Sequence, residues 1–270
     1  MILSEFCKKN YGLNQPVPTL SNIIIYPVKA LSGVELTSVE ITQGGTLKND
    51  RRWAMVDRKG RMQNGKNNSL IFSLQASFDL EEGLVSFANE EQQFELSANR
   101  LLEEFLSERL KKPIMLKENI EAGFPDDPDA YGPTVVTTSS LETVTSWYPG
   151  LTLEEIRARF RINLEIGGAA AFWEDQVFRF GEQPKSISMG EVLIQPTNPC
   201  ARCAVPMKEP ATGEAYDEFY ETFIEQRELN KPVWLDVRSF DHWYRLSLNT
   251  RIPLQQQGKI LNLNDPVEIL

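Results

Sequence analysis

The sequence predicts a β-rich α+β protein, because short strand-like runs dominate it and a few well-capped helices lie among them. The chain has 270 residues, of which 41% are hydrophobic and 24% are charged. This composition is typical of a folded globular protein and excludes global disorder. The acidic, Pro- and Gly-rich segment 121–133 indicates a connecting loop. We therefore expect an N-terminal tail over 1–19, one domain over 20–118 and a second over 119–270.

The first half contains short apolar or alternating runs, which are typical of strands. The predicted strands cover residues 22–28, 34–42, 53–56, 70–74, 84–87, 93–96 and 114–116. Before the last of these, Asn99 is suited to cap a helix whose apolar residues recur at helical spacing and which Pro113 ends. The regular spacing of the predicted short strands along the first half of the chain is typical of a barrel or a compact sheet.

The second half combines strands with helices. Capping boxes at Ser139–Glu142 and Thr152–Glu155 predict helices that extend through Trp147 and to Arg159. An amphipathic helix is expected over 214–229. Further strands are expected over residues 134–137, 163–166, 191–195, 259–263 and 267–270, the last two as a closing pair.

The net charge of −10 argues against a general nucleic-acid surface, which needs a basic stripe. A phosphate group would have to be held by a few local cations. The longest apolar runs fall far short of the roughly 20 residues that a membrane helix needs, so we expect no membrane association. The first residues lack the pattern of a signal peptide, which makes a cytoplasmic location the expectation.

The single histidine and the three cysteines restrict the possible chemistry. His242 lies among aromatic residues, which favours a packing role over a catalytic one. Cys200 and Cys203 form a C-x-x-C motif that follows a predicted strand, while Cys7 lies in the polar tail. No second pair completes a four-ligand zinc or iron–sulfur site. The pair is left with three interpretations: a soft thiolate ligand for an already complexed metal, a sulfur-transfer thiol, or a structural element.

Five segments in a fixed order carry a resemblance that covers residues 20 to 270. They are Ile25–Lys29 with Gly33-Val34, Asn49–Trp53, Phe160–Asn163, Pro199–Cys203 followed by Ala211–Gly213, and the terminal Gly258–Leu270. The first two resemble the MOSC N-terminal β-barrel domain, and the others resemble the MOSC domain itself. The fold that this implies is a MOSC N-terminal β-barrel domain over 20–118, packed on a barrel-like MOSC domain over 119–270.

The resemblance implies a molybdenum-cofactor oxidoreductase like the amidoxime-reducing components, which reduce N-hydroxylated compounds. In that family one protein cysteine joins the pterin dithiolene on molybdenum, and the corresponding residue here is Cys203. Contacts to the pterin and its phosphate are implied for Lys29, Arg51 and Arg161, with Thr137, Asn163 and Arg202 as further candidates. Two positions depart from the family pattern: Ala30 replaces a serine that offers a phosphate hydrogen bond, and Ile162 replaces a proline.

General chemistry agrees with this assignment. Thiolate suits a soft metal, and arginine suits a phosphate. The predicted helix after Thr137 would add free N–H groups. We expect both halves to contribute to one cofactor site at their junction.

Electrons must come from elsewhere. The chain has too few cysteines for an iron–sulfur cluster beside Cys203, and it lacks a Gly-rich dinucleotide motif. We therefore expect a separate ferredoxin-like or cytochrome-type donor protein. We also expect the enzyme to be a monomer.

Two other functions remain open. MOSC domains also occur in pyridoxal-phosphate-dependent cofactor sulfurases, so the chain could be a molybdenum-cofactor carrier or a sulfur-transfer module without reductase activity. Pyridoxal phosphate itself is not expected, because the aminotransferase-like part is absent from these residues. A binding module that has lost its cofactor is the third possibility.

Overall fold

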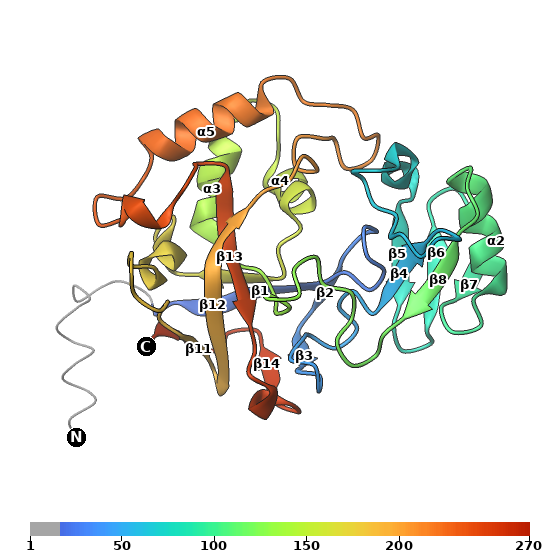
Figure 1. The fold of residues 1–270 in the computed structure, drawn as a ribbon, viewed down its shortest axis with the longest axis horizontal. Helices are drawn as coiled ribbons and strands as arrows, with labels where there is room; N and C mark the ends of the chain where they lie inside the picture. The colour runs from blue at the N-terminus through green and yellow to red at the C-terminus, as the bar shows by residue number, and fades with distance from the viewer. Residues whose placement is uncertain (1–16) are drawn as a thin grey trace.

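The computed structural model describes residues 17–270, so Cys7 and most of the predicted tail lie outside the described residues. Its largest element is an eight-stranded sheet with the order β15-β11-β12-β13-β9-β10-β1-β2 (Figure 1). These strands are β1 (Thr19–Ile25), β2 (Val34–Leu36), β9 (Val135–Thr137), β10 (Leu164–Gly167), β11 (Ile187–Met189), β12 (Val192–Ala201), β13 (Arg245–Arg251) and β15 (Val267–Ile269).

The N-terminal strands are built into the same sheet as the C-terminal half. Strand β1 runs antiparallel to β10, with Thr19 opposite Gly167. Likewise, β3 (Ser38–Glu40) pairs with β14 (Ile260–Asn262). Apolar residues of both halves form one core cluster, in which Ile23 and Ile41 lie with Leu248 and Ile252. The two halves therefore share a hydrophobic core, and the division at residue 118 stays a prediction.

Residues 53–118 form a smaller unit on the right of Figure 1. Its elements are β4 (Trp53–Val56), the 3₁₀ helix η1 (Ser69–Ser73), β5 (Ala76–Asp79), β6 (Leu84–Phe87), β7 (Gln93–Glu95), α2 (Arg100–Arg109) and β8 (Met115–Glu118). Strands β4 and β8 form one sheet and β5, β6 and β7 another. Phe87, Phe94 and Phe105 pack against one another in its core, with ring centroids 4.7 to 6.0 Å apart.

Three helices pack against the large sheet and form a third, largely aromatic core. They are α3 (Thr138–Ser146), α4 (Leu153–Phe160) and α5 (Phe219–Leu229). The rings of Tyr148 and Phe219 stack with their centroids 4.3 Å apart, and the ring centroids of Phe160 and Phe223 are 5.7 Å apart. Short 3₁₀ helices cover Trp173–Val177 (η2), Val237–Ser239 (η3) and Leu254–Gln256 (η4). None of the helices in residues 17–270 is both long and apolar enough to span a membrane.

The structure confirms the β-rich α+β class and corrects several local expectations. Residues 70–74 form the helix η1 instead of a strand, because the Asn68 side chain accepts the Leu70 N–H and caps it. Thr137, two residues before the expected Ser139, caps α3. The C-terminal strands pair with β3 and β11 and not with each other. The hydrogen-bonded strands of residues 17–270 do not close into a barrel.

The side chain of Glu174 is a buried carboxyl group next to α3, and its pKa is shifted by this environment. Glu174 accepts hydrogen bonds from the hydroxyls of Thr137 and Ser140, both at 3.0 Å. Burial raises the pKa of Glu174 from 4.5 to about 8, and the neighbouring Asp175 adds to this effect. Asp175 itself pairs with the buried Arg227.

Replacing Glu174 with glutamine should flatten the pH dependence of stability. Between pH 4.5 and 8 the folded protein binds more protons at this residue than the unfolded chain does, so its free energy of unfolding falls as pH rises. Glutamine cannot ionise, so the stability of Glu174→Gln relative to wild type should increase by about 1–3 kcal/mol from pH 5 to pH 8. Urea unfolding at both pH values measures this difference. The control is Glu142→Gln, because Glu142 also lies on α3 but is exposed. The prediction would be contradicted if wild type and Glu174→Gln lost the same amount of stability between pH 5 and pH 8.

Candidate functional site

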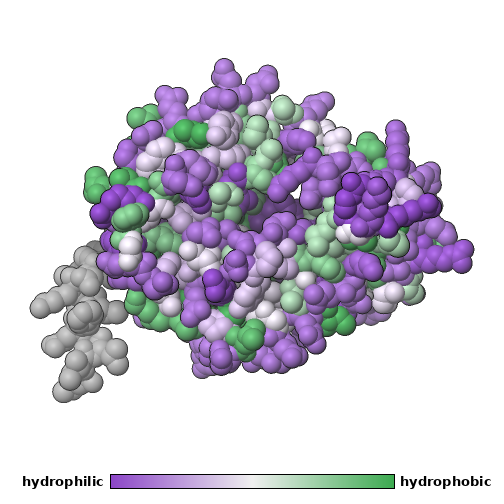
Figure 2. Space-filling model, viewed as in Figure 1, coloured by the Kyte–Doolittle hydropathy of each residue, from purple (hydrophilic) through white to green (hydrophobic). Residues whose placement is uncertain are grey.

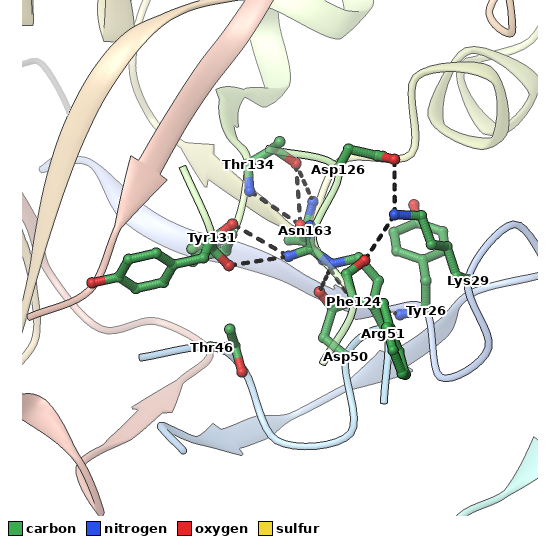
Figure 3. Close-up of polar contacts among 12 residues, drawn as sticks. Tyr26, Lys29, Thr46, Asp50, Arg51, Phe124, Asp126, Tyr131, Thr134 and Asn163 are labelled. Atoms are coloured by element: carbon green, nitrogen blue, oxygen red, sulfur yellow. Dashed lines mark hydrogen bonds and ion pairs between the residues drawn. The ribbon is translucent and has the colours of Figure 1, made fainter. Parts of the chain in front are cut away.

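Asp50 is the centre of a buried polar network that joins the two halves of the chain. The residue is 2% exposed, and its side chain is fully buried. One carboxylate oxygen accepts the Tyr26 N–H at 2.8 Å and the Asn163 amide at 3.1 Å. The other accepts the Arg51 Nε at 2.7 Å (Figure 3). Three different segments therefore meet at a single carboxylate.

Arg51 is held in a fixed orientation by this network. Besides the ion pair with Asp50, its Nη2 lies 3.4 and 3.3 Å from the carbonyl oxygens of Tyr131 and Gly132. Its backbone is left-handed, with φ of 50°. Ala30, Asn49 and Arg161 have positive φ as well. Such conformations cost energy in non-glycine residues and are enriched at functional sites.

Lys29 is a nearly buried ammonium beside Arg51. It lies just after the β1 strand, where its backbone N–H donates to the Trp53 carbonyl at 2.7 Å. Its Nζ donates to the Phe124 carbonyl at 2.8 Å and lies 2.9 Å from the Asp126 carboxylate. Burial lowers the pKa of Lys29, and Asp126 opposes this shift.

Arg161 belongs to this cationic region and forms no ion pair within the described residues. It follows α4 in a left-handed conformation, and its guanidinium stacks 4.0 Å from the centroid of the Tyr26 ring. That guanidinium makes no hydrogen bond or ion pair with any other residue of 17–270. Burial lowers the pKa of Arg161, while Tyr26, Asp50 and Asp126 oppose the shift. Its N–H groups are therefore available to an anionic ligand.

Arg202 connects the cysteine motif to this region. Strand β12 ends at Ala201, and the Arg202 N–H then donates to the Tyr244 carbonyl at 3.0 Å. One guanidinium nitrogen lies 3.1 Å from Cys200 Sγ and another donates to the carbonyl of Phe160, the residue before Arg161. Cys200 is buried and Cys203 is partly exposed, and both are free thiols.

Contacts thus extend without a break from Lys29 and Arg51 in the first half to the C-x-x-C motif in the second. The segment after Cys203 then crosses back to the first half (Figure 1). Lys208 Nζ donates to the Gly65 carbonyl at 3.3 Å, and the Gln75 amide donates to the Pro210 carbonyl at 3.2 Å. Figure 2 shows the surface hollowed near the middle of this face and lined largely by hydrophilic side chains.

Two of the sequence-predicted residues have other roles in the structure. Asn163 is buried, where its amide binds Asp50 and its oxygen accepts from Thr134 at 3.1 Å. It supports the network and does not line open space. Thr137 is fully buried at the C-terminal end of β9. Its hydroxyl and that of Ser140, at the start of α3, both donate hydrogen bonds to Glu174. Among the described residues, the Thr137 hydroxyl contacts Ser140, Ala170 and Glu174 and none of the cations, and its role in cofactor binding stays a prediction.

Three residues of the site were missed in the sequence. Asp50 directly precedes Arg51, but adjacent residues give no sign of which charge is buried. Tyr26 lies in the same strand-end segment as Lys29, and only the fold shows its ring under Arg161. Asp126 lies in the acidic loop, which the sequence identified only as a connection.

No group of three or more His, Cys, Asp or Glu side chains within residues 17–270 is arranged to hold a metal ion. A metal at Cys203 would therefore need further ligands from a bound molecule. The donors that this region offers are one accessible thiol and several cationic side chains.

Comparison with known proteins agrees with the architecture. Residues 17–114 match the family model of the MOSC N-terminal beta barrel domain. The chain is 23% identical over 224 residues to a molybdenum cofactor sulfurase from Caenorhabditis elegans, and this match covers 73% of the chain. The chain spans about 30% of the length of that relative. Residues 17–114 are thus similar to the MOSC N-terminal beta barrel domain, and the two similarities together support a MOSC-domain protein.

Proposed function

We propose that this protein binds a molybdenum cofactor between its two halves and uses it to reduce N-hydroxylated compounds, with electrons from a separate donor protein. The observation that carries the proposal is the stacked guanidinium of Arg161, which has no partner in residues 17–270 and lies in a cluster with Lys29 and Arg51. A chain with net charge −10 collects these cations in one place, which supports a specific anionic ligand.

The residues fit the phosphate of such a cofactor. Arginine binds a phosphate through paired N–H groups. Within the described residues, none of the guanidinium N–H groups of Arg161 is used in a hydrogen bond. Lys29 and Arg51 are already held in position, by Phe124 and by Asp50 respectively. Pre-organised donors lose little conformational entropy when the ligand binds. The roles of Asp50 and Asn163 in this proposal are to orient the cations.

Cys203 is proposed as the protein ligand of molybdenum. Its thiol is free and partly exposed, whereas the Cys200 thiol is buried and receives a hydrogen bond from Arg202. When bound, the cofactor would supply a metal centre that accepts two electrons and passes them to the substrate. The protein would bind the phosphate, supply the thiolate, and fix that thiolate on the loop that Lys208 and Pro210 attach to the first half.

A carrier or sulfur-transfer function is the alternative, and the name of the matched relative favours it. In that case the same residues would hold the cofactor without substrate turnover. Molybdenum content combined with a reductase assay separates the two functions: metal with turnover supports the reductase, and metal without turnover supports the carrier.

Removing the Arg161 side chain should strongly reduce cofactor retention. Asparagine is the suitable replacement because it tolerates the left-handed backbone of this position. After expression in a host that makes the cofactor, molybdenum per chain should fall about tenfold or more in Arg161→Asn, which corresponds to about 1.4 kcal/mol of binding energy. Arg100→Gln, which removes an exposed arginine on α2, should retain the wild-type content. Equal metal content in all three proteins would exclude Arg161 from the site.

The two cysteines should respond differently to substitution. Cys203→Ser should lose both bound molybdenum and reductase activity, because serine is a poor ligand for a soft metal. Cys200→Ser should keep the metal, since Arg202 can donate to a hydroxyl as well. Elemental analysis and assay of both purified variants measure this difference. Loss of metal only in Cys200→Ser would reverse the assignment.

The purified chain should need an external electron source. A chemical reductant should support reduction of an N-hydroxylated substrate, whereas NADH alone should not, because the chain has no dinucleotide motif. Parallel assays with each donor provide the measurement. NADH-driven turnover by the contaminant-free chain would reject the separate donor.

A further inference from the structure

Asp126 and Lys29 form an ion pair in which the carboxylate is largely exposed and the ammonium is nearly buried. Their side chains are 75% and 8% exposed, and the charged atoms lie 2.9 Å apart (Figure 3). Asp126 lies in the segment between β8 and β9. Within residues 17–270 its contact with Lys29 is the only polar contact that Asp126 makes. The carboxylate can therefore turn toward solvent without breaking another hydrogen bond.

Lys29 does not depend on this contact for its position. Its ammonium also donates to the Phe124 carbonyl at 2.8 Å, and the Phe124 N–H is in turn fixed to the Arg51 carbonyl at 2.9 Å. Loss of the Asp126 carboxylate would leave Lys29 in place with free donors. The next residue, Asp127, accepts the Asp129 N–H at 2.8 Å, so the turn after Asp126 is fixed independently.

Asp126 lies among the cations that the proposed function assigns to a phosphate. Lys29, Lys66 and Arg51 all act electrostatically on its carboxylate, and Asp126 acts in turn on Arg161. Desolvation by the surrounding residues opposes the shift, but Lys29 and the other cations lower the pKa of Asp126 below its ordinary value. The carboxylate is thus ionised at neutral pH and neutralises part of the cluster.

We propose that Asp126 is an internal counter-ion, which neutralises the Lys29 ammonium in the free protein and is displaced when a phosphate group binds. This inference rests on the anion site of the proposed function. Displacement replaces one carboxylate by a phosphate with more charge and more acceptor oxygens, which Arg51 and Arg161 then share. Asp126 therefore competes with the ligand, lowers its affinity and promotes its release.

Titration of the full chain with inorganic phosphate tests the proposal. The protein is purified from a host that cannot make the cofactor, and binding is followed by calorimetry in phosphate-free buffer at constant ionic strength. Asp126→Asn should bind phosphate about tenfold more tightly than wild type, because one adjacent competing charge is removed. The control Asp127→Asn removes the same charge one residue away and keeps the acceptor of its turn, so its affinity should stay within about twofold of wild type. Arg161→Asn should bind more weakly.

Each other outcome has a definite meaning. If Asp126→Asn and wild type bind equally while Arg161→Asn binds more weakly, the anion site stands and the counter-ion proposal is wrong. If Asp127→Asn tightens binding as much as Asp126→Asn does, the effect is one of overall charge, and the proposal is wrong as well. Absence of phosphate binding in every protein would overturn both the anion site and the counter-ion. Asp126→Ala, which should behave like Asp126→Asn, repeats the test without a side-chain amide.

Discussion

The site depends most of all on the buried carboxylate of Asp50. A carboxylate without water is costly unless its oxygens are fully hydrogen-bonded, and here a backbone N–H, an amide and a guanidinium supply the donors. Since the donors come from the residue directly after β1, from the segment before β10 and from the left-handed turn at Arg51, the carboxylate fixes three chain segments at once. It also determines which way Arg51 faces. The cationic cluster can therefore be precise only where this one anion is satisfied.

The balance of charge in the site contrasts with that of the whole molecule. An excess of acidic side chains repels a phosphate at long range, but screening by salt limits that repulsion to roughly 10 Å. Among the groups that act electrostatically on Lys29, Asp126 and Arg161, the cations Lys29, Arg51, Lys66 and Arg161 outnumber the carboxylates Asp50 and Asp126. Aromatic stacking adds to this arrangement, because the Tyr26 ring supports Arg161 without consuming its hydrogen-bond donors. The site is thus selective by local geometry and owes nothing to the overall charge.

Local signals in the sequence were sufficient for much of the secondary structure. The strand Trp53–Val56 has the predicted bounds, and the Thr152 capping box forms with both of its reciprocal hydrogen bonds. Residues 70–74 were mistaken for a strand because a short apolar run has no period that separates a strand from a 3₁₀ turn. The pairing of β1 with β10 was beyond local reasoning, since it joins segments far apart in the chain. For the same reason the cations could be identified from motif order, whereas the burial of Asp50, the stacking of Tyr26 and the return of the acidic loop to Lys29 could not.

The long-range pairing of β1 has a consequence for the order of events during synthesis. Strand β1 can pair with the nearby β2 early, but its other neighbour, β10, is made much later, and Thr19 additionally bridges to Pro266 near the C-terminal end of the chain. Contacts of such high sequence separation form slowly, because a large loop must close before they contribute any stability. Lys29 and Arg51 therefore leave the ribosome long before Arg161 and Cys203 can join them. A ligand that needs all four residues has no complete site on the nascent chain, so its insertion must follow the folding of the whole protein.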